Sequence, residues 1–228
     1  MNFNDYVTQG FAFFQKNEFG PALENFRAAG KLNPDNTDIQ NLVGMLEEKI
    51  RMEKQASQAL ADEAKHRAEA MGIKVEDVDR VIAECTETLK HNPNDASAKS
   101  GLALVYYIRG LDFMSDGDYR QAIKDYNEAI KYQPDYPHAF NKRGQAYLAN
   151  GDFDNAIADF EKLIQPNQNN KMAENLLANA YMKRGIEHDK KKDYIHAISD
   201  FENVLKFKPD DATACELLEM AKAEKAKQ

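Results

Sequence analysis

Apolar and small residues recur at helical spacing through most of the chain, in short blocks separated by turn residues. Two such blocks lie between Ala139 and Phe160, on either side of the pair Gly151-Asp152. A spacing of three and four residues places apolar side chains on one face of an α-helix. The pattern therefore predicts helices paired across short turns, with one helix ending near Asn150 and the next beginning near Asp154.

The same block recurs along the chain. Gly110 and Gly144 are 34 residues apart, and so are Ala122 and Ala156. A fixed period of this length indicates a repeat architecture, in which each unit packs mainly on its neighbours. The first helix of each unit carries a glycine, which we expect to let a neighbouring helix approach closely because it has no side chain. These glycines are Gly10, Gly110, Gly144 and Gly185.

The residues of this block resemble the tetratricopeptide repeat (TPR), whose signature is a bulky residue, a Gly-x2-Tyr step, an Ala-x3-Phe step and a Pro. Four units carry it. Their matching residues are Tyr6, Gly10, Phe13, Ala22, Phe26 and Pro34; Tyr106, Gly110, Phe113, Ala122, Tyr126 and Pro134; Phe140, Gly144, Tyr147, Ala156 and Phe160; and Tyr181, Gly185, Ala197, Phe201 and Pro209. One departure is His188, which stands where the family has an aromatic residue. The resemblance implies an all-α, right-handed solenoid of helix-turn-helix repeats.

The repeats predict a single solenoid over residues 1–228. Its expected segments are a repeat (3–36), an atypical long helix with a degenerate repeat (37–95), a repeat with an extended first helix (96–136), a repeat (137–170), a second repeat with an extended first helix (171–211), and a capping helix with a tail (212–228). The extensions follow from spacing. Gly144 and Gly185 are 41 residues apart, seven more than the period, which is close to two helical turns.

The long helix is expected from Thr37 to about Met71, ending near Gly72, because this stretch has no Pro and only one Gly. Its apolar stripe is regular as far as Ile50 and consists mainly of alanine beyond Met52. Two interpretations stay open. The helix is either the stretched first helix of a degenerate repeat, or an arm that pairs with another chain in a coiled-coil seam.

Each first helix carries a second stripe, one residue further round than the stripe that packs the repeats. In TPR proteins this stripe lines the concave groove where partners bind, so the resemblance implies a groove with apolar flanks and amides in the middle, which could hold a peptide backbone. The expected groove residues are Tyr107, Leu111, Met114, Asn141, Gln145, Leu148, Met182 and Ile186, with two cations, Lys142 and Lys183. In the first unit Val7, Phe11 and Phe14 either extend the groove or are covered by the long helix.

We therefore expect a non-catalytic scaffold or adaptor that binds a peptide or helix of a partner protein. A self-assembling protein that uses the same apolar surface or the long helix is the alternative. A second alternative is a co-chaperone-like binder of acidic C-terminal peptides. The carboxylate clamp of such family members is not matched, because its positions fall on Tyr107, Leu111, Lys142, Asn179 and Lys183.

Catalysis is not expected, since the chain has no nucleophile elbow, phosphate-binding loop or His-Glu-x-x-His motif.

The composition of the chain excludes several classes of partner and location. A net charge of −8 disfavours nucleic acid, and no apolar run approaches the length of a membrane span. Cys85 and Cys215 are far apart in sequence, which favours a reducing, cytoplasmic location over a disulfide framework. His188, Asp189 and His196 could be arranged around a metal ion, but their spacing matches no recognised motif. No metal or other cofactor is therefore expected.

Overall fold

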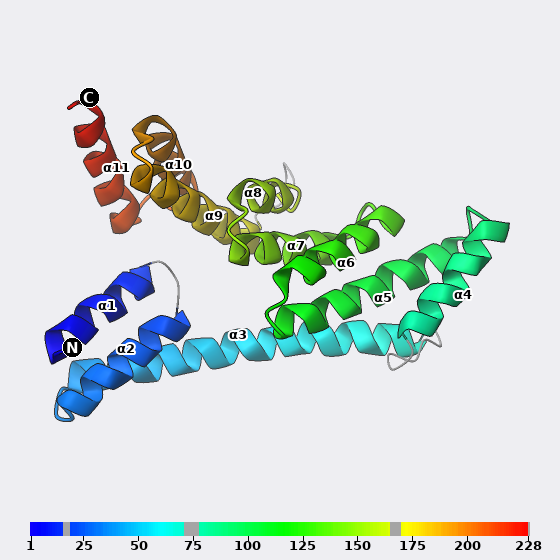
Figure 1. The fold of residues 1–228 in the computed structure, drawn as a ribbon, viewed down its shortest axis with the longest axis horizontal. Coiled ribbons are helices and arrows are strands. Elements are labelled where there is room, and N and C mark those ends of the chain that lie inside the picture. Colours follow the sequence, from blue (N-terminus) through cyan, green and yellow to red (C-terminus); the bar gives the residue numbers. More distant parts are fainter. Residues whose placement is uncertain (16–18, 71–77, 165–169, 228) are drawn as a thin grey trace. The chain divides into compact units, whose positions relative to one another are not determined.

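The computed structural model describes residues 1–15, 19–70, 78–164 and 170–227, and these residues form eleven α-helices and no β-strand (Figure 1). The all-α prediction is confirmed. The predicted helix stop at Gly72 lies outside the described residues. Contacts divide the chain into two compact units, Met1–Leu60 and Ala61–Gln228, and each is described by itself.

The first unit contains α1 (Phe3–Gln15), α2 (Phe19–Leu32) and the part of α3 (Thr37–Ala70) that precedes Ala61. Phe26 of α2 is fully buried at its centre. A Cβ atom added to Gly10 of α1 would lie 2.6 Å from the Phe26 ring, so α1 approaches α2 as closely as the repeat predicts. Ile39 and Leu46 of α3 are buried in the same core.

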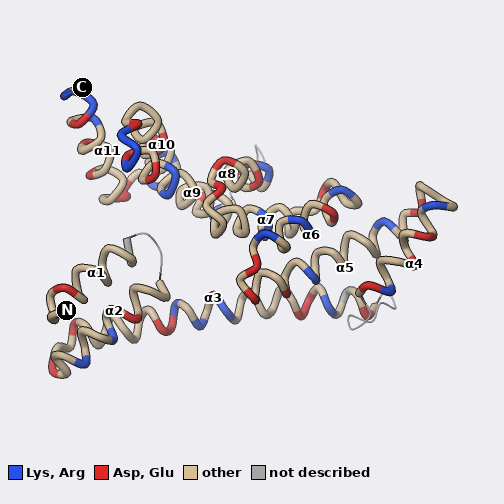
Figure 2. Tube along the Cα trace, viewed as in Figure 1, with Lys and Arg blue, Asp and Glu red and all other residues tan. Residues whose placement is uncertain are grey.

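Helix α3 is 34 residues long, and its acidic and basic residues alternate along the chain (Figure 2). Several of these charges pair one turn apart on the exposed surface, as Lys49 does with Glu53 at 3.5 Å and Arg51 with Glu48. Pairs of this spacing favour the helix but each contributes little, because both partners are solvated. Among the described helices, none is long and apolar enough to cross a membrane.

In the second unit each helix packs on the next in chain order. After the end of α3 follow α4 (Val78–His91), α5 (Ala96–Ser115), α6 (Tyr119–Tyr132), α7 (Pro137–Ala149), α8 (Phe153–Glu161), α9 (Lys171–Lys190), α10 (Tyr194–Phe207) and α11 (Ala212–Lys225). Helices α5 and α6, α7 and α8, and α9 and α10 are the pairs of three repeats. Helices α5 and α9 each have 20 residues where α7 has 13, so the predicted seven-residue extension is present in both.

The repeat glycines let the first helix of each pair lie against an aromatic ring of the second. A Cβ atom at Gly144 would lie 2.5 Å from Cε1 of Phe160, well inside van der Waals contact. The same distance is 2.6 Å for Gly110 and Tyr126 and 2.7 Å for Gly185 and Phe201. All three rings are fully buried, so none has room to move away from a larger residue.

A ladder of arginine–aspartate pairs runs through the same three repeats. Arg143 donates through Nε and Nη2 to the two carboxylate oxygens of Asp159, at 2.7 and 2.6 Å, and through Nη1 to Oδ1 of Asn127 at 2.6 Å. Asp159 is only 2% exposed. Burial opposes the positive charge and acts to lower the pKa of Arg143, but the hydrogen bond and charge of Asp159 outweigh it and raise that pKa.

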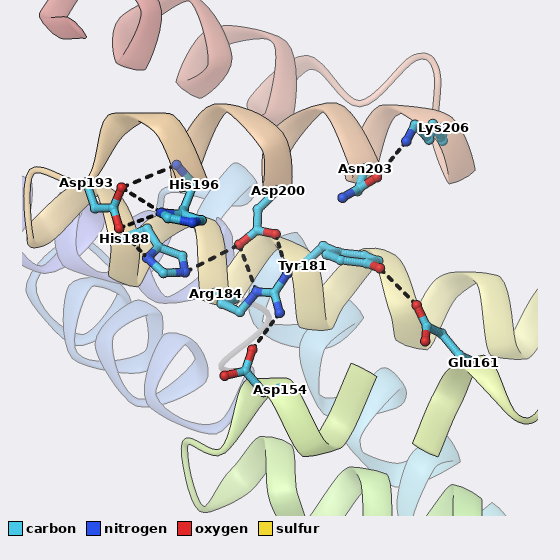
Figure 3. Close-up of polar contacts among 10 residues, drawn as sticks. All are labelled: Asp154, Glu161, Tyr181, Arg184, His188, Asp193, His196, Asp200, Asn203 and Lys206. Carbon is cyan, nitrogen blue, oxygen red and sulfur yellow. Dashed lines mark hydrogen bonds and ion pairs between the residues drawn. The ribbon is translucent and has the colours of Figure 1, made fainter. Parts of the chain in front are cut away.

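The other two repeats have the same geometry. Arg109 binds Asp125 and reaches Asp79, and Arg184 binds Asp200 and reaches Asp154 (Figure 3). Each arginine therefore connects the second helix of its own repeat to the second helix of the preceding one. This ladder was not predicted from the sequence, although each arginine directly precedes a repeat glycine and each central aspartate directly precedes a repeat aromatic.

Candidate protein-binding face

The predicted groove residues of the second unit come from the first helix of each repeat, and the structure divides them by exposure. The half-buried ones are Met114 of α5, Gln145 and Leu148 of α7, and Lys183 and Ile186 of α9. We call these five residues the α5–α7–α9 face. The remaining predicted residues are buried: Tyr107, Leu111, Asn141, Lys142 and Met182.

The end of α3 explains why the stripe on α5 is buried. Ala64 and Ala68 belong to the same core cluster as Tyr107 and Leu111, with Met114 packed against it. Tyr107 is 2% exposed and Leu111 is 9% exposed. Burial raises the pKa of Tyr107, and the phenol of Tyr136 and the carboxylate of Glu63 on α3 raise it further. The last turns of α3 therefore cover the α5 stripe, and they do so with small side chains.

This arrangement corrects the expectation that Tyr107 and Leu111 are accessible to a partner. Leu111 is a core position in this structure, so a charged residue there would test folding and not binding. The half-buried part of the stripe begins one turn later, at Met114.

The amides expected in the middle of the groove form a pair on α7. Gln145 donates through Nε2 to Oδ1 of Asn141 at 2.8 Å, and Asn141 is buried. Lys142 is also buried, and that burial lowers its pKa. The structure therefore places Lys142 inside the repeat and not at the surface, where an acidic peptide was expected to meet it.

The corresponding stripe of the first unit is the most exposed. Phe11 is 41% exposed and Phe14 36%, although each ring has one edge-on aromatic neighbour, Phe26 at 5.0 Å and Phe19 at 5.8 Å. Val7 is half-buried. Val7 packs against the core that contains Ile39 and Leu46 of α3, so Phe11 and Phe14 are the exposed part of this stripe.

Comparisons with known proteins agree with the repeat pattern. Residues 109–171 and residues 178–211 match family models described as tetratricopeptide repeat. No curated protein matches the chain.

Solved structures similar to this chain include three TPR or related proteins. The first TPR domain of human RPAP3 is 25% identical, with 55% of this chain and 94% of that chain covered and a TM-score of 0.34. The MamA protein is 20% identical, covering 92% and 94%, with a TM-score of 0.36. The TPR2AB domain of yeast Sti1, solved in a complex with pHSP90, is 16% identical, covering 96% and 98%, with a TM-score of 0.35.

Proposed function

This chain is a tetratricopeptide repeat protein, and we propose that it is a scaffold or adaptor that binds a helix or extended segment of a partner protein on the α5–α7–α9 face. Tetratricopeptide repeats are a protein–protein interaction module and are usually non-catalytic. Two free thiols, Cys85 and Cys215, support a reducing compartment such as the cytoplasm.

The observation that carries the proposal is the packing of α3 on α5. A helix of this chain, with small alanines toward α5, already covers the start of the second stripe. The same stripe continues along α7 and α9 with half-buried apolar residues, Leu148 and Ile186, and with the amide of Gln145. Partly exposed apolar side chains beside one polar group suit a helix or strand that presents apolar side chains of its own.

The face can be tested by making its apolar residues polar without adding charge. The variant Met114→Gln/Leu148→Gln/Ile186→Gln is expected to weaken partner binding at least tenfold, or about 1.4 kcal/mol, because three apolar contacts are lost together. Binding is measured by comparing the proteins that the immobilised full chains retain from an extract of the source cells, and then by titrating the main one.

The matched control is Ile195→Gln on α10, which makes the same change at a side chain that is 64% exposed on the second helix of its pair. This control should retain the partner. Circular dichroism must show unchanged helicity for both variants. Equal binding by the triple variant and the control, with helicity intact, would remove the face from consideration.

Self-association is the second candidate, and it is favoured by Phe11 and Phe14 of α1. Two neighbouring phenylalanines that each expose more than a third of their surface are uncommon on a monomer and can pair with a second copy. This candidate uses the first unit, so it is separable from binding on the α5–α7–α9 face.

A further inference from the structure

Two imidazoles and a carboxylate converge at the turn between α9 and α10, and we propose that His188, Asp193 and His196 bind a divalent transition-metal ion. One potential ligand atom from each of the three side chains lies within 4.8 Å of the others. Figure 3 shows the three side chains together at the end of the helix pair, with contacts from Asp193 to both imidazoles. The site is separate from the α5–α7–α9 face, and the proposal does not depend on the proposed function.

The fold places the three residues by reversing the chain between them. His188 lies in the last turn of α9, Asp193 is the N-cap residue of α10, and His196 lies in the first turn of α10. Lys192 makes the reversal with a φ of 60°, where the two preceding repeats have Gly117 and Gly151. The sequence suggested Asp189 as the acidic partner of the two histidines. The structure brings in Asp193 instead, because it follows the turn and faces back toward both histidines.

The donor atoms already point at one another. The Nδ1 atom of His188 lies 3.4 Å from Oδ2 of Asp193, and Nδ1 of His196 lies 2.7 Å from the same oxygen. The two imidazole rings are stacked, with centroids 5.2 Å apart. A metal ion bound by Nδ1 of both rings and by Asp193 would take the place of the contact between His196 and this carboxylate.

A second carboxylate lies near the far side of the His188 ring. The Nε2 atom of His188 lies 3.9 Å from Oδ2 of Asp200, and Asp200 is held in place by both hydrogen bonds from Arg184 (Figure 3). This distance is longer than a hydrogen bond, so Asp200 adds negative charge near the ring but does not fix which ring nitrogen carries the proton. The arginine–aspartate ladder thus places a buried carboxylate near His188 as well as joining the repeats.

Two imidazoles and one carboxylate favour a particular class of metal ion. Imidazole nitrogens favour copper, zinc and nickel over calcium and magnesium, which prefer a full shell of oxygen atoms. Three protein ligands leave further positions for water, and His196 is exposed. The neighbouring Lys190 and Lys191 would repel a cation, but both lie near Glu187, at 3.8 and 3.4 Å, which offsets part of their charge.

The preceding repeat shows that the turn does not need histidines. There Tyr147 and Asn155 occupy the positions of His188 and His196, and Asp152 occupies that of Asp193. Asn155 donates to Asp152 at 2.7 Å, and Asp152 caps α8. An asparagine is therefore sufficient beside the capping aspartate. The helix cap does not need two imidazoles, and at these positions they supply a pair of potential metal ligands.

The test is a titration of the full chain, free of any polyhistidine tag and stripped with a chelator. Zn²⁺, Cu²⁺ and Ni²⁺ chlorides are added in an isothermal titration calorimeter, with Ca²⁺ and Mg²⁺ for comparison. We expect one transition-metal ion per chain and a rise in melting temperature on binding. The variant His188→Tyr/His196→Asn, which copies the third repeat, should lower the affinity at least tenfold, and Asp193→Asn should lower it while keeping the helix cap.

The control variant is His91→Gln, which removes a histidine that pairs with a single carboxylate, Glu87. It should bind as the unmodified chain does. Heat of binding that stays unchanged in His188→Tyr/His196→Asn, or that falls equally in His91→Gln, would overturn the proposal. So would the absence of any saturable binding by the unmodified chain.

Discussion

Asp159→Ala is expected to lower the free energy of unfolding by about 3–5 kcal/mol, because it leaves the Arg143 guanidinium, whose side chain is only 14% exposed, without its carboxylate. Both bidentate hydrogen bonds, at 2.7 and 2.6 Å, are lost at once. Arg143 also holds Asn127 of the preceding repeat, so the substitution loosens the contact between two repeats. The measurement is urea-induced unfolding followed by circular dichroism.

Two control variants distinguish the effect of leaving a charge buried and unpaired from the effect of losing an ion pair. Glu84→Ala breaks an exposed ion pair with Arg80 and should cost at most about 1 kcal/mol. Arg143→Met/Asp159→Leu replaces both buried charges by apolar groups and should recover much of the loss, because no unpaired charge remains. A cost below about 1 kcal/mol for Asp159→Ala would show that the ladder does not stabilise the repeats.

Phe160→Ala is expected to cost about 3–5 kcal/mol, because the ring is fully buried and its removal leaves a cavity between α7 and α8. Gly144→Ala should cost about 1–3 kcal/mol for the opposite reason, since its new methyl group overlaps the ring. The double variant should cost less than the sum of the two, because the methyl group then enters the space that the ring has left. The free energies of urea-induced unfolding of the unmodified chain and the three variants form a double-mutant cycle.

Tyr126→Phe is the matched control for this cycle, because it changes the equivalent residue of the preceding repeat to the one that Phe160 already is. The Tyr126 hydroxyl is buried and has no hydrogen-bond partner among the described residues. Its removal should therefore leave stability unchanged or raise it slightly. Strict additivity of Gly144→Ala and Phe160→Ala would contradict the close contact on which the repeat depends.

The sequence predicted the helix pairs well because their determinants are local and periodic. The glycine, alanine and aromatic positions recur at 34 or 41 residues, and the same spacing predicted that α5 and α9 are two turns longer than α7. Gly144 and Phe160, for example, form the close contact between α7 and α8. Each lies at a fixed sequence distance from the turn that joins these two helices. Such a pattern can be found without knowledge of any contact between distant segments.

The contacts that the sequence did not predict are those made by charged or small residues. Arg143 and Asp159 carry charges, which on a helix are usually solvated, and nothing in their types indicates that both are buried. The alanines at the end of α3 bury Tyr107 and Leu111, but a run of alanines fits a solvated helix equally well. The convergence of His188 and His196 on Asp193 depends on the geometry of one turn, which the sequence spacing alone does not give.

The central claim, that partners bind on the α5–α7–α9 face, is tested most directly by a photo-crosslinking amino acid placed at position 148, with position 195 as the control. The control side chain is the more exposed of the two, so nonspecific capture would favour it. We predict a discrete crosslink to another protein from position 148 and none from position 195. Crosslinks to a second copy of the chain alone would show that this face pairs copies of the chain and does not bind a different partner. Equal crosslinking from both positions, or none from position 148, would contradict the claim.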